Sequence, residues 1–398
     1  GASPRVAKRA HPLRLFAVPF ETGVQQPRPE TELATMRVEH GGGPPEFHEV
    51  NVPPEWKDKF APESIEFITH DRFDENFKAW SIVYYRARLK CDPKSWVVFE
   101  VTQTRSPEIQ RDLHMERRLK MLSMTLVGQM SNVCLAFESH IFAGSTFVLR
   151  PDVDGNLQLF LNNGFHTSPE PPRDLESYLP SLCFLIDILR GLQSLERAGV
   201  VHFNLSPSSI VIRKGRAYIA NFGSSCLQHD VDPGFGCKCF ADTQGHFVGS
   251  SLRHAPEMEG GRPTGPVNNM WAVGLIFAEL VLGKMPVEAA LPGKIPGAHA
   301  GSAGVIKVND GLDTILCGRD DIRSAVTNKF DISEVSGFRR LPKQITALLL
   351  AMLAKDGDRR ADATAALRIA ESILAEGGHG VRPEAPRLEL PLAWYEQK

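Results

Sequence analysis

The residues best placed to do chemistry lie between Gly199 and Gly223. The polar side chains there that could take part in chemistry are His202, Asn204, Ser209 and Asn221. An imidazole can exchange a proton near neutral pH, whereas a carboxamide cannot accept one. A carboxamide or hydroxyl oxygen also lacks the negative charge that a hard cation such as Mg²⁺ favours. These side chains can donate and accept hydrogen bonds, and they are poorly suited to general-base or magnesium chemistry.

This stretch resembles the catalytic and metal-binding loops of protein kinases. Those enzymes carry His-Arg-Asp-Leu-x-x-x-x-Asn, then a short hairpin and Asp-Phe-Gly. Here residues 202–204 read His-Phe-Asn and residues 221–223 read Asn-Phe-Gly. The resemblance implies that Asn204 occupies the position of the catalytic base. It places Ser209 at the metal-binding asparagine and Asn221 at the metal-binding aspartate.

The other residues of the two loops are retained for packing rather than for chemistry. His202, Phe222 and Gly223 match the kinase pattern, and we expect them to act as structural spacers in the core. Phe203 replaces the arginine that often receives an activation-loop phosphate in kinases. Regulation through such a phosphate is therefore not expected.

Further matches follow in the order in which kinases carry them. They are Leu182–His202 as the helix before the catalytic loop, Ala255-Pro256-Glu257, the Asn269–Gly274 and Leu282–Pro286 segments, and Lys355–Arg360. Trp271 lies in the segment that resembles Asp-x-Trp-Ser-x-Gly, and we expect it to be a structural anchor. The resemblance also predicts an ion pair between Glu257 and Arg360.

The lysine that binds nucleotide phosphates in kinases has no counterpart in the corresponding strand. That position falls on Thr102 or, in a shifted register, on Glu100, and no lysine occurs between Lys94 and Lys120. Glu116 is the candidate for the carboxylate that would pair with this lysine, and it would lack its partner.

The glycine-rich loop is missing as well. Kinases use glycines there because side chains would block close approach of the backbone to the phosphates. No glycine occurs between Gly43 and Gly128, and the expected turn, residues 70–77, is bulky and acidic. Acidic side chains would repel a triphosphate, so we expect no bound nucleotide and no cofactor or metal.

The pattern of elements predicts an α+β fold with two lobes, typical of protein kinases. We expect an N-terminal extension over 1–61, partly disordered, and a kinase-like domain over 62–375, followed by a tail over 376–398. The N-lobe, 62–152, should hold a small five-stranded sheet and one main helix, and the C-lobe, 153–375, should be mainly helical. The expected strands are 65–69, 80–88, 95–102, 133–142 and 146–149, and the expected helices are 107–122, the helix before the catalytic loop, 269–282, 345–353 and 363–374.

Composition excludes some classes of partner. The chain has 398 residues and a formal net charge of −2, which gives no electrostatic argument for nucleic acid. It contains no run of apolar residues long enough to span a membrane. The basic, partly apolar start of the extension leaves membrane or partner tethering open, although Pro19 argues against a continuous amphipathic helix there.

Three cysteines cluster in one loop of a chain that has seven. They are Cys226, Cys237 and Cys239, with His229 and His246 nearby. A disulfide, free thiols and a zinc site all remain open, although Cys-x-Cys lacks the usual paired spacing of zinc ligands. A disulfide would require an oxidising compartment.

The glycine-free N-lobe, the asparagine replacements and the long N-terminal segment resemble the secreted rhoptry-type and dense-granule kinases and pseudokinases of apicomplexan parasites. That resemblance implies secretion into the parasitophorous vacuole and a place in the cyst wall. The expected function is a catalytically inactive pseudokinase that binds protein partners. The alternative is an atypical nucleotide-binding enzyme that holds metal through Glu100, Glu116 or the acids of residues 70–77.

Overall fold

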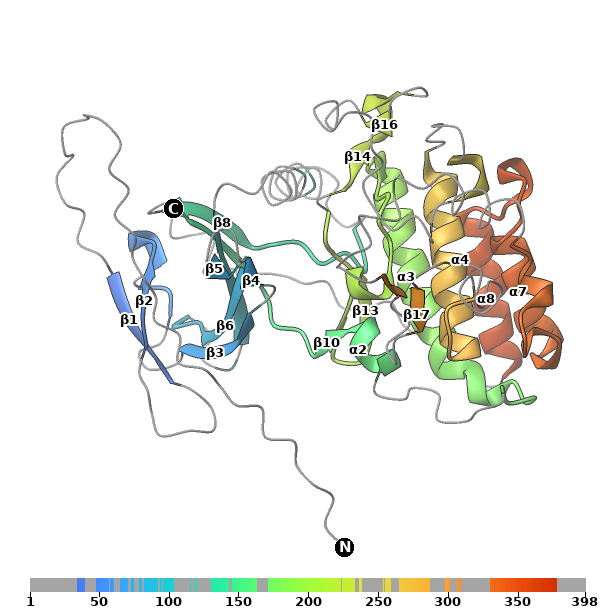
Figure 1. Cartoon of the computed structure of the whole chain (residues 1–398), viewed down its shortest axis with the longest axis horizontal. Coiled ribbons are helices and arrows are strands. Elements are labelled where there is room, and N and C mark those ends of the chain that lie inside the picture. The colour runs from blue at the N-terminus through green and yellow to red at the C-terminus, as the bar shows by residue number, and fades with distance from the viewer. Residues whose placement is uncertain are drawn as a thin grey trace, which may run out of the picture.

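The computed structural model shows a β-sheet at one end of the molecule and a helical bundle at the other (Figure 1). The residues that it describes are 34–39, 48–56, 58–60, 65–70, 73–74, 79–80, 82–91, 94, 96–103, 115, 119, 130–142, 145–162, 171–222, 224–232, 236–237, 253, 255–258, 265–286, 298–300, 306–308 and 330–377. Their buried apolar side chains form two main clusters, one in the sheet and one in the bundle.

The sheet has seven strands in the order β2-β1-β3-β6-β7-β9-β8, rather than the five expected. The strands are β1 (Ala34–Glu39), β2 (His48–Val52), β3 (Ile65–His70), β6 (Ile82–Arg88), β7 (Trp96–Gln103), β8 (Glu138–Phe142) and β9 (Ser145–Pro151). Neighbours are antiparallel except β1 and β3, which pair in parallel. The two additional strands come from the segment expected to be an extension. Strand β4 (Phe73–Asp74), inside the expected turn of residues 70–77, pairs with β5 (Ala79–Trp80), which lies after that turn.

The expected domain boundary at residue 62 is too late. Trp56, at the end of the 3₁₀ helix η1 (Pro54–Trp56), and Phe60 are both fully buried. The indole of Trp56 meets the rings of Phe60, Phe99 and Phe147 edge-on, at centroid separations of 5.7–5.9 Å. A large aromatic side chain contributes strongly to a core, so the segment before residue 62 completes the N-lobe.

A carboxylate holds this segment against the edge of the sheet. Glu138 on β8 accepts a hydrogen bond of 2.8 Å from the indole N–H of Trp56, and it also contacts Lys59 and His140. Burial alone would raise the pKa of Glu138, but these hydrogen bonds and the charge of Lys59 lower it to about 2. Glu138 is therefore ionised over the whole physiological range and ties η1 to the sheet.

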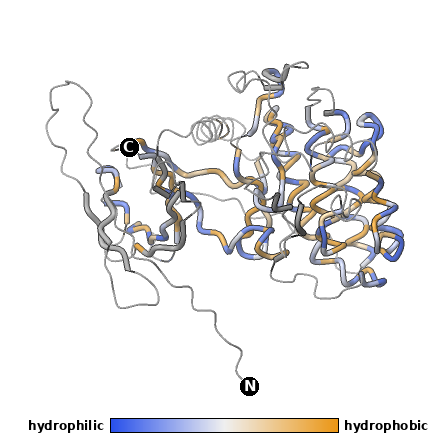
Figure 2. The backbone as a smooth tube through the Cα atoms, viewed as in Figure 1, coloured by the Kyte–Doolittle hydropathy of each residue, from blue (hydrophilic) through white to orange (hydrophobic). Residues whose placement is uncertain are grey.

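The helical lobe is built around α3 (Leu179–Arg197) and α4 (Pro266–Leu282). Helices α7 (Lys343–Met352) and α8 (Ala363–Glu376) pack beside them, and the short α2 (Leu157–Asn162) lies near the sheet side (Figure 1). Apolar residues concentrate in the interior of this bundle, as Figure 2 shows. Helix α4 is buried over nearly its whole length, as its continuous apolar sequence predicts.

The helix ends follow local sequence signals. Gly199, just beyond α3, and Gly283, at the C-cap of α4, have φ values of 66° and 69°. Glycine enters this left-handed region without the steric cost that a Cβ atom brings. Asp362 caps the N-terminus of α8, since its carboxylate accepts a hydrogen bond of 2.7 Å from the main-chain N–H of Ala365.

The hairpin between the two loops of interest is short. Strand β12 (Ile210–Arg213) pairs with β13 (Arg216–Ile219), and Lys214 and Gly215 form the turn with φ values of 50° and 71°. Two successive positive φ angles match a two-residue type I′ turn, whose twist suits a hairpin. Strands β10 (Gly155–Asn156) and β12 also pair, so the hairpin belongs to a small three-stranded sheet.

The chain between the two lobes docks on α3. Val133 forms a parallel bridge with Ile219 and is not part of β8, so the strand expected over 133–142 begins only at Glu138. A Cβ atom on Gly191 would lie 2.5 Å from the carbonyl oxygen of Asn132. Glycine is therefore required in α3 for this close approach. Of the helix expected over 107–122, Met115 and Leu119 are described as helical and buried, and the other residues lie outside the described part.

We expect Trp56→Ala to lower the free energy of unfolding by about 3–5 kcal/mol, because it leaves a large cavity in a closed core. Trp96→Ala is the matched control, since Trp96 is only half-buried and the guanidinium carbons of Arg86 and Arg88 each lie 4.4 Å from the centre of its ring. Urea unfolding monitored by circular dichroism compares the two variants. Equal losses would contradict a structural role for the segment before residue 62.

Candidate functional site

His202 occupies the centre of the candidate site and is completely buried. It follows β11 (Val200–Val201), and its Nε2 lies 2.9 Å from the carbonyl oxygen of Ala220, at the end of β13. The main-chain N–H of Asn204 donates to His202 Nδ1 at 3.3 Å. One ring nitrogen must therefore donate while the other accepts, which is the pattern of a neutral imidazole.

Burial lowers the pKa of His202 to about 4, and the main-chain contacts oppose this only in part. A charged imidazolium would lose its water shell here without gaining a carboxylate partner among the described contacts. The ring also packs against Phe222, at a centroid separation of 5.3 Å. His202 thus joins the two loops as a neutral, hydrogen-bonded core residue, in agreement with the expected packing role.

Asn269 on α4 fixes the backbone beside His202. Its Oδ1 accepts hydrogen bonds from the main-chain N–H groups of His202, at 3.2 Å, and Phe203, at 3.4 Å. Phe203 has a φ of 61°, which is uncommon for a non-glycine residue. The Phe203 side chain packs against the core of the helical lobe. The side chain of Asn269 on α4 thus holds the loop in a tight turn.

Asn204 and Asn221, the expected base and metal positions, differ in exposure. Asn204 is half-buried and Asn221 is exposed. Asn221 has a φ of 63°. Asparagine and aspartate tolerate this left-handed conformation better than most residues, since a short polar side chain can bond locally. Replacement of an aspartate by asparagine at this position therefore preserves the backbone turn while removing the negative charge.

Ser209 is buried, and its hydroxyl is used within its own turn. It lies in η3 (Pro207–Ser209), where its Oγ donates to the carbonyl of Ser206 and accepts from the N–H of Ser206, each at 2.9 Å. The main-chain carbonyl of Ser209 accepts a hydrogen bond of 2.9 Å from Ala220. The residue at the expected metal-binding position thus acts as a cap that connects the loop to the hairpin.

The sheet positions expected for the missing lysine lie away from these loops in sequence and carry no cation. Thr102 lies in β7 and pairs with Ile82 and Thr146. Glu100 forms an ion pair with Arg150 of β9, with 2.6 Å between Oε1 and Nε. Val101, the neighbour of Glu100, packs against the N-lobe core, so Glu100 belongs to the opposite face of the strand. Glu116 and Gly223 lie outside the described residues.

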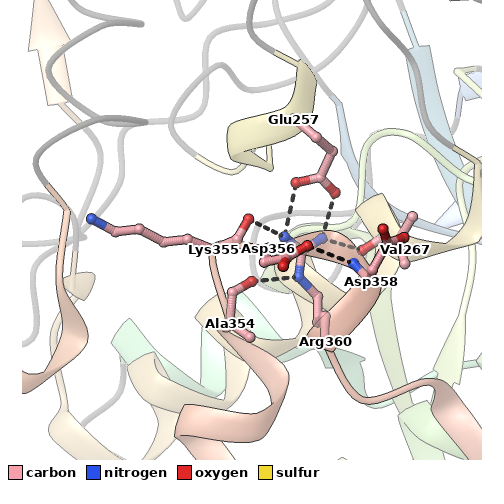
Figure 3. Close-up of polar contacts among 7 residues, drawn as sticks. All are labelled: Glu257, Val267, Ala354, Lys355, Asp356, Asp358 and Arg360. Carbon is pink, nitrogen blue, oxygen red and sulfur yellow. Dashed lines mark hydrogen bonds and ion pairs between the residues drawn. The ribbon is translucent and has the colours of Figure 1, made fainter.

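The predicted ion pair between Glu257 and Arg360 is confirmed (Figure 3). The guanidinium binds both carboxylate oxygens, with N–O distances of 2.5 and 2.8 Å. It also donates to the carbonyls of Val267 and Ala354, at 2.8 and 3.0 Å. The Arg360 side chain is fully buried, and its guanidinium carbon lies 5.1 Å from the ring centre of Trp271. One side chain thus joins η7 (Pro256–Met258), the start of α4 and the end of α7.

Two further buried ion pairs escaped the sequence-based prediction. Asp187 on α3 pairs with Arg216 of β13 and accepts a hydrogen bond of 3.1 Å from the N–H of Ala217. Arg253 pairs with Glu279 on α4 at 2.7 Å, and both residues are buried. For the second pair the sequence held a signal, because Glu279 is the one acid in a helix that is otherwise almost entirely apolar. These pairs anchor the hairpin and the segment before Glu257 to the two central helices.

Cys226 takes part in a disulfide, so the first of the open alternatives holds for this residue. It lies in β14 (Cys226–Leu227), directly after the Asn221–Gly223 loop, and pairs with Val201 of β11 across a short ladder. Its partner cysteine lies outside the residues whose side chains are described. In contrast, Cys91, Cys134 and Cys183 form no disulfide.

The structure therefore brings His202, Asn204, Ser209, Asn221 and Phe222 together, and it places Thr102 in a separate sheet. Within the described ranges, His, Cys, Asp and Glu form no group of three or more that could hold a metal ion. In the same part of the chain, no helix combines the length and apolar character needed to cross a bilayer.

Residues 181–370 match the family model of the protein kinase domain. A stretch of 101 residues is 37% identical to mitogen-activated protein kinase kinase kinase 17 of Arabidopsis thaliana, covering 25% of this chain and 24% of that protein. A stretch of 114 residues is 34% identical to a human TBC domain-containing protein kinase-like protein, covering 26% of this chain and 12% of that protein. A longer stretch of 194 residues is 29% identical to mitogen-activated protein kinase HOG1 of Kluyveromyces lactis, covering 46% of this chain and 39% of that protein.

The chain thus spans less than half of the length of each of these relatives. The expectation of a protein kinase fold, α+β with an N-terminal sheet and helical regions, is confirmed.

Replacing Arg360 should strongly destabilise the fold. We expect Arg360→Met to lower the free energy of unfolding by about 3–5 kcal/mol, because it leaves the Glu257 carboxylate without its cation. The neighbouring Arg359 is the matched control, since its side chain is 84% exposed. Arg359→Met should change the free energy of unfolding by less than about 0.5 kcal/mol. Chemical denaturation of both variants measures this, and similar losses would refute the anchoring role.

His202 should make stability depend on pH. Its pKa is lowered from 6.5 to about 4 on folding. The unfolded chain therefore takes up the proton first, and the contribution of His202 to stability is lost as the pH falls from 6.5 to 4. At about 1.4 kcal/mol per pKa unit, the loss approaches about 3 kcal/mol.

The measurement compares the wild type with His202→Gln at several pH values. Glu196 has its pKa raised to about 7 by burial and by Asp362, so its own contribution runs in the opposite direction. Because Glu196 is present in both proteins, it cancels in their difference. That difference in unfolding free energy should shrink as the pH falls, and a constant difference would show that His202 is not buried in its neutral form.

Proposed function

We propose that the protein kinase fold of this chain is a pseudokinase: it has lost phosphoryl transfer and acts as a protein-binding scaffold or allosteric partner. The single observation that carries the proposal is the state of the catalytic positions. Asn204 and Asn221 stand where kinases need carboxylates, in loops whose backbone is otherwise held in place by His202 and Asn269. The framework of the site is retained, while the groups that would do the chemistry are replaced.

The loss of charge explains why the arrangement is unsuited to transfer. Asn204 cannot take the proton of a hydroxyl substrate, and loss of a general base typically lowers the rate by about 10²–10⁴-fold. Asn221 offers a neutral oxygen where Mg²⁺ needs a carboxylate. The third candidate ligand, Ser209, already donates its hydroxyl proton to the carbonyl of Ser206. The three changes together weaken both proton transfer and metal binding.

Nucleotide binding is disfavoured by the sheet as well. A phosphate-binding lysine would have to project from β7, where Thr102 and Glu100 occupy the candidate positions. Glu100 is held by Arg150, and both side chains are largely buried. A paired carboxylate adds no attraction for a triphosphate. We therefore infer that the fold functions without ATP and without a metal or other cofactor.

The disulfide of Cys226 supports a location outside the reducing cytosol. Disulfides persist in oxidising compartments and are rare in reducing ones, and Cys226 is one of the most deeply buried cysteines of the described part. We propose secretion on this basis, and the narrower placement among the apicomplexan rhoptry-type and dense-granule pseudokinases of the vacuole and cyst wall rests on the resemblance alone. The proposed partners are proteins, with no role for nucleic acid.

A second candidate function is an atypical enzyme with a reorganised nucleotide site. It would use Glu100, Glu116 or the acids of residues 70–77 to hold a metal ion. The ion pair of Glu100 with Arg150 counts against this use, since the carboxylate would first have to give up a guanidinium. The first proposal therefore fits the described contacts better.

A thermal-shift titration with Mg-ATP and Mn-ATP separates the two functions. A ligand at a hundred times its dissociation constant stabilises the folded state by about 2.7 kcal/mol, which is readily measured. We expect no change in melting temperature up to millimolar nucleotide. A saturable increase that disappears in Glu100→Gln would instead establish the atypical nucleotide site. Arg359→Met serves as a control for unspecific effects of changing a charged residue.

A further inference from the structure

A groove on the helical lobe lies apart from the residues discussed so far. It is a cavity of about 420 Å³ between η9 (Ile332–Glu334), η10 (Phe338–Arg340) and α7. Its lining residues are Ser333, Phe338, Arg339, Leu341, Lys343, Thr346, Ala347 and Leu350. The groove is open to solvent rather than enclosed.

The floor of the groove is apolar and firmly placed. Phe338 and Leu341 are only 3% and 6% exposed and belong to the core of the helical lobe. Gly337, with a φ of 94°, allows the turn before η10, where a Cβ atom would lie 2.8 Å from Pro171. Leu350 forms one wall and is 46% exposed, one of the few large apolar side chains that the described surface leaves open to water. An apolar side chain of a bound partner that entered the groove would cover Leu350.

The rim is positively charged. Arg339 and Lys343 line the groove and are both exposed, and its lining contains no carboxylate. The hydroxyls are already engaged: Ser333 donates to Asp331 at 2.8 Å, and Thr346 donates to the carbonyl of Pro342 at 3.1 Å. The nearby carboxylate of Asp331 accepts both the hydroxyl and the N–H of Ser333. The groove thus offers an occupant an apolar floor and cationic edges.

We propose that this groove is a docking site for a peptide segment of a partner protein, in which an apolar side chain is flanked by acidic residues. The apolar side chain would cover Leu350 and the floor, and the carboxylates would pair with Arg339 and Lys343. A basic segment would place like charges together and is excluded. The site does not depend on the loss of phosphoryl transfer, because an active kinase could use the same surface.

A display selection with a randomised twelve-residue peptide library tests this against the full chain. We expect enrichment of peptides that carry Leu, Ile, Phe or Met next to Asp or Glu. A fluorescein-labelled copy of the most enriched peptide is then titrated by anisotropy. Leu350→Asp and the double variant Arg339→Glu, Lys343→Glu should each weaken binding at least tenfold, and the wild-type affinity should fall with added salt because exposed charges are screened.

Helix α8 supplies matched controls. Ile369 is 38% exposed and the adjacent Arg368 is also exposed, so Ile369→Asp and Arg368→Glu make the same chemical changes outside the groove. They should alter binding by less than twofold. All variants change surface residues, and equal melting temperatures would confirm that each one is folded.

Several results would overturn the proposal. They are enrichment of basic peptides, the absence of any enriched peptide, and binding that the groove variants and the α8 controls affect equally. Self-association of the wild type that Leu350→Asp abolishes in sedimentation velocity would show that a second copy, rather than a partner peptide, occupies the groove. None of these results bears on nucleotide binding, which the thermal-shift titration addresses separately.

Discussion

A buried guanidinium must have its charge and its N–H groups satisfied, and the helical lobe is arranged around the one that Arg360 supplies. Its partners come from three places in the sequence: Glu257, the start of α4 at Val267, and the chain after α7 at Ala354. Removing one member of such a group leaves a charge in a poorly solvated place, which costs far more than a surface pair would. The positions of η7, α4 and α7 relative to one another therefore depend on this contact.

The same requirement explains what the candidate site has kept. His202 and Asn269 satisfy the main-chain groups of a loop that turns through a positive φ at Phe203. Asn221 holds a second such turn, where a short polar side chain is favoured whether or not it is charged. In the proposed pseudokinase, the residues needed for backbone geometry are kept, and those that would supply charge to a substrate or metal are replaced. Within one loop, the residues that fix the backbone geometry are therefore different from those that phosphoryl transfer would need.

Much of the helical lobe could be predicted because its signals are local. The apolar periodicity of α3 and the continuous apolar run of α4 were expected from the sequence pattern, and both are present. The Glu257–Arg360 pair is not a local signal; it was expected from the resemblance to protein kinases, and it is present. The N-lobe was predicted less well. Strands β1 and β2 are short, contain polar residues and surround a Gly- and Pro-rich segment, so only their pairing in the sheet reveals them. Trp56 likewise gave no periodic signal, because its partners are distant in sequence.

An assay with γ-labelled ATP tests directly the proposal that this kinase fold does not transfer phosphate. The purified chain is incubated with Mg²⁺ or Mn²⁺ and a general protein substrate, beside a heat-inactivated sample and the Asn204→Ala variant. We expect label incorporation to equal that of the heat-inactivated sample in every case. Steady incorporation by the wild type that Asn204→Ala abolishes would contradict it.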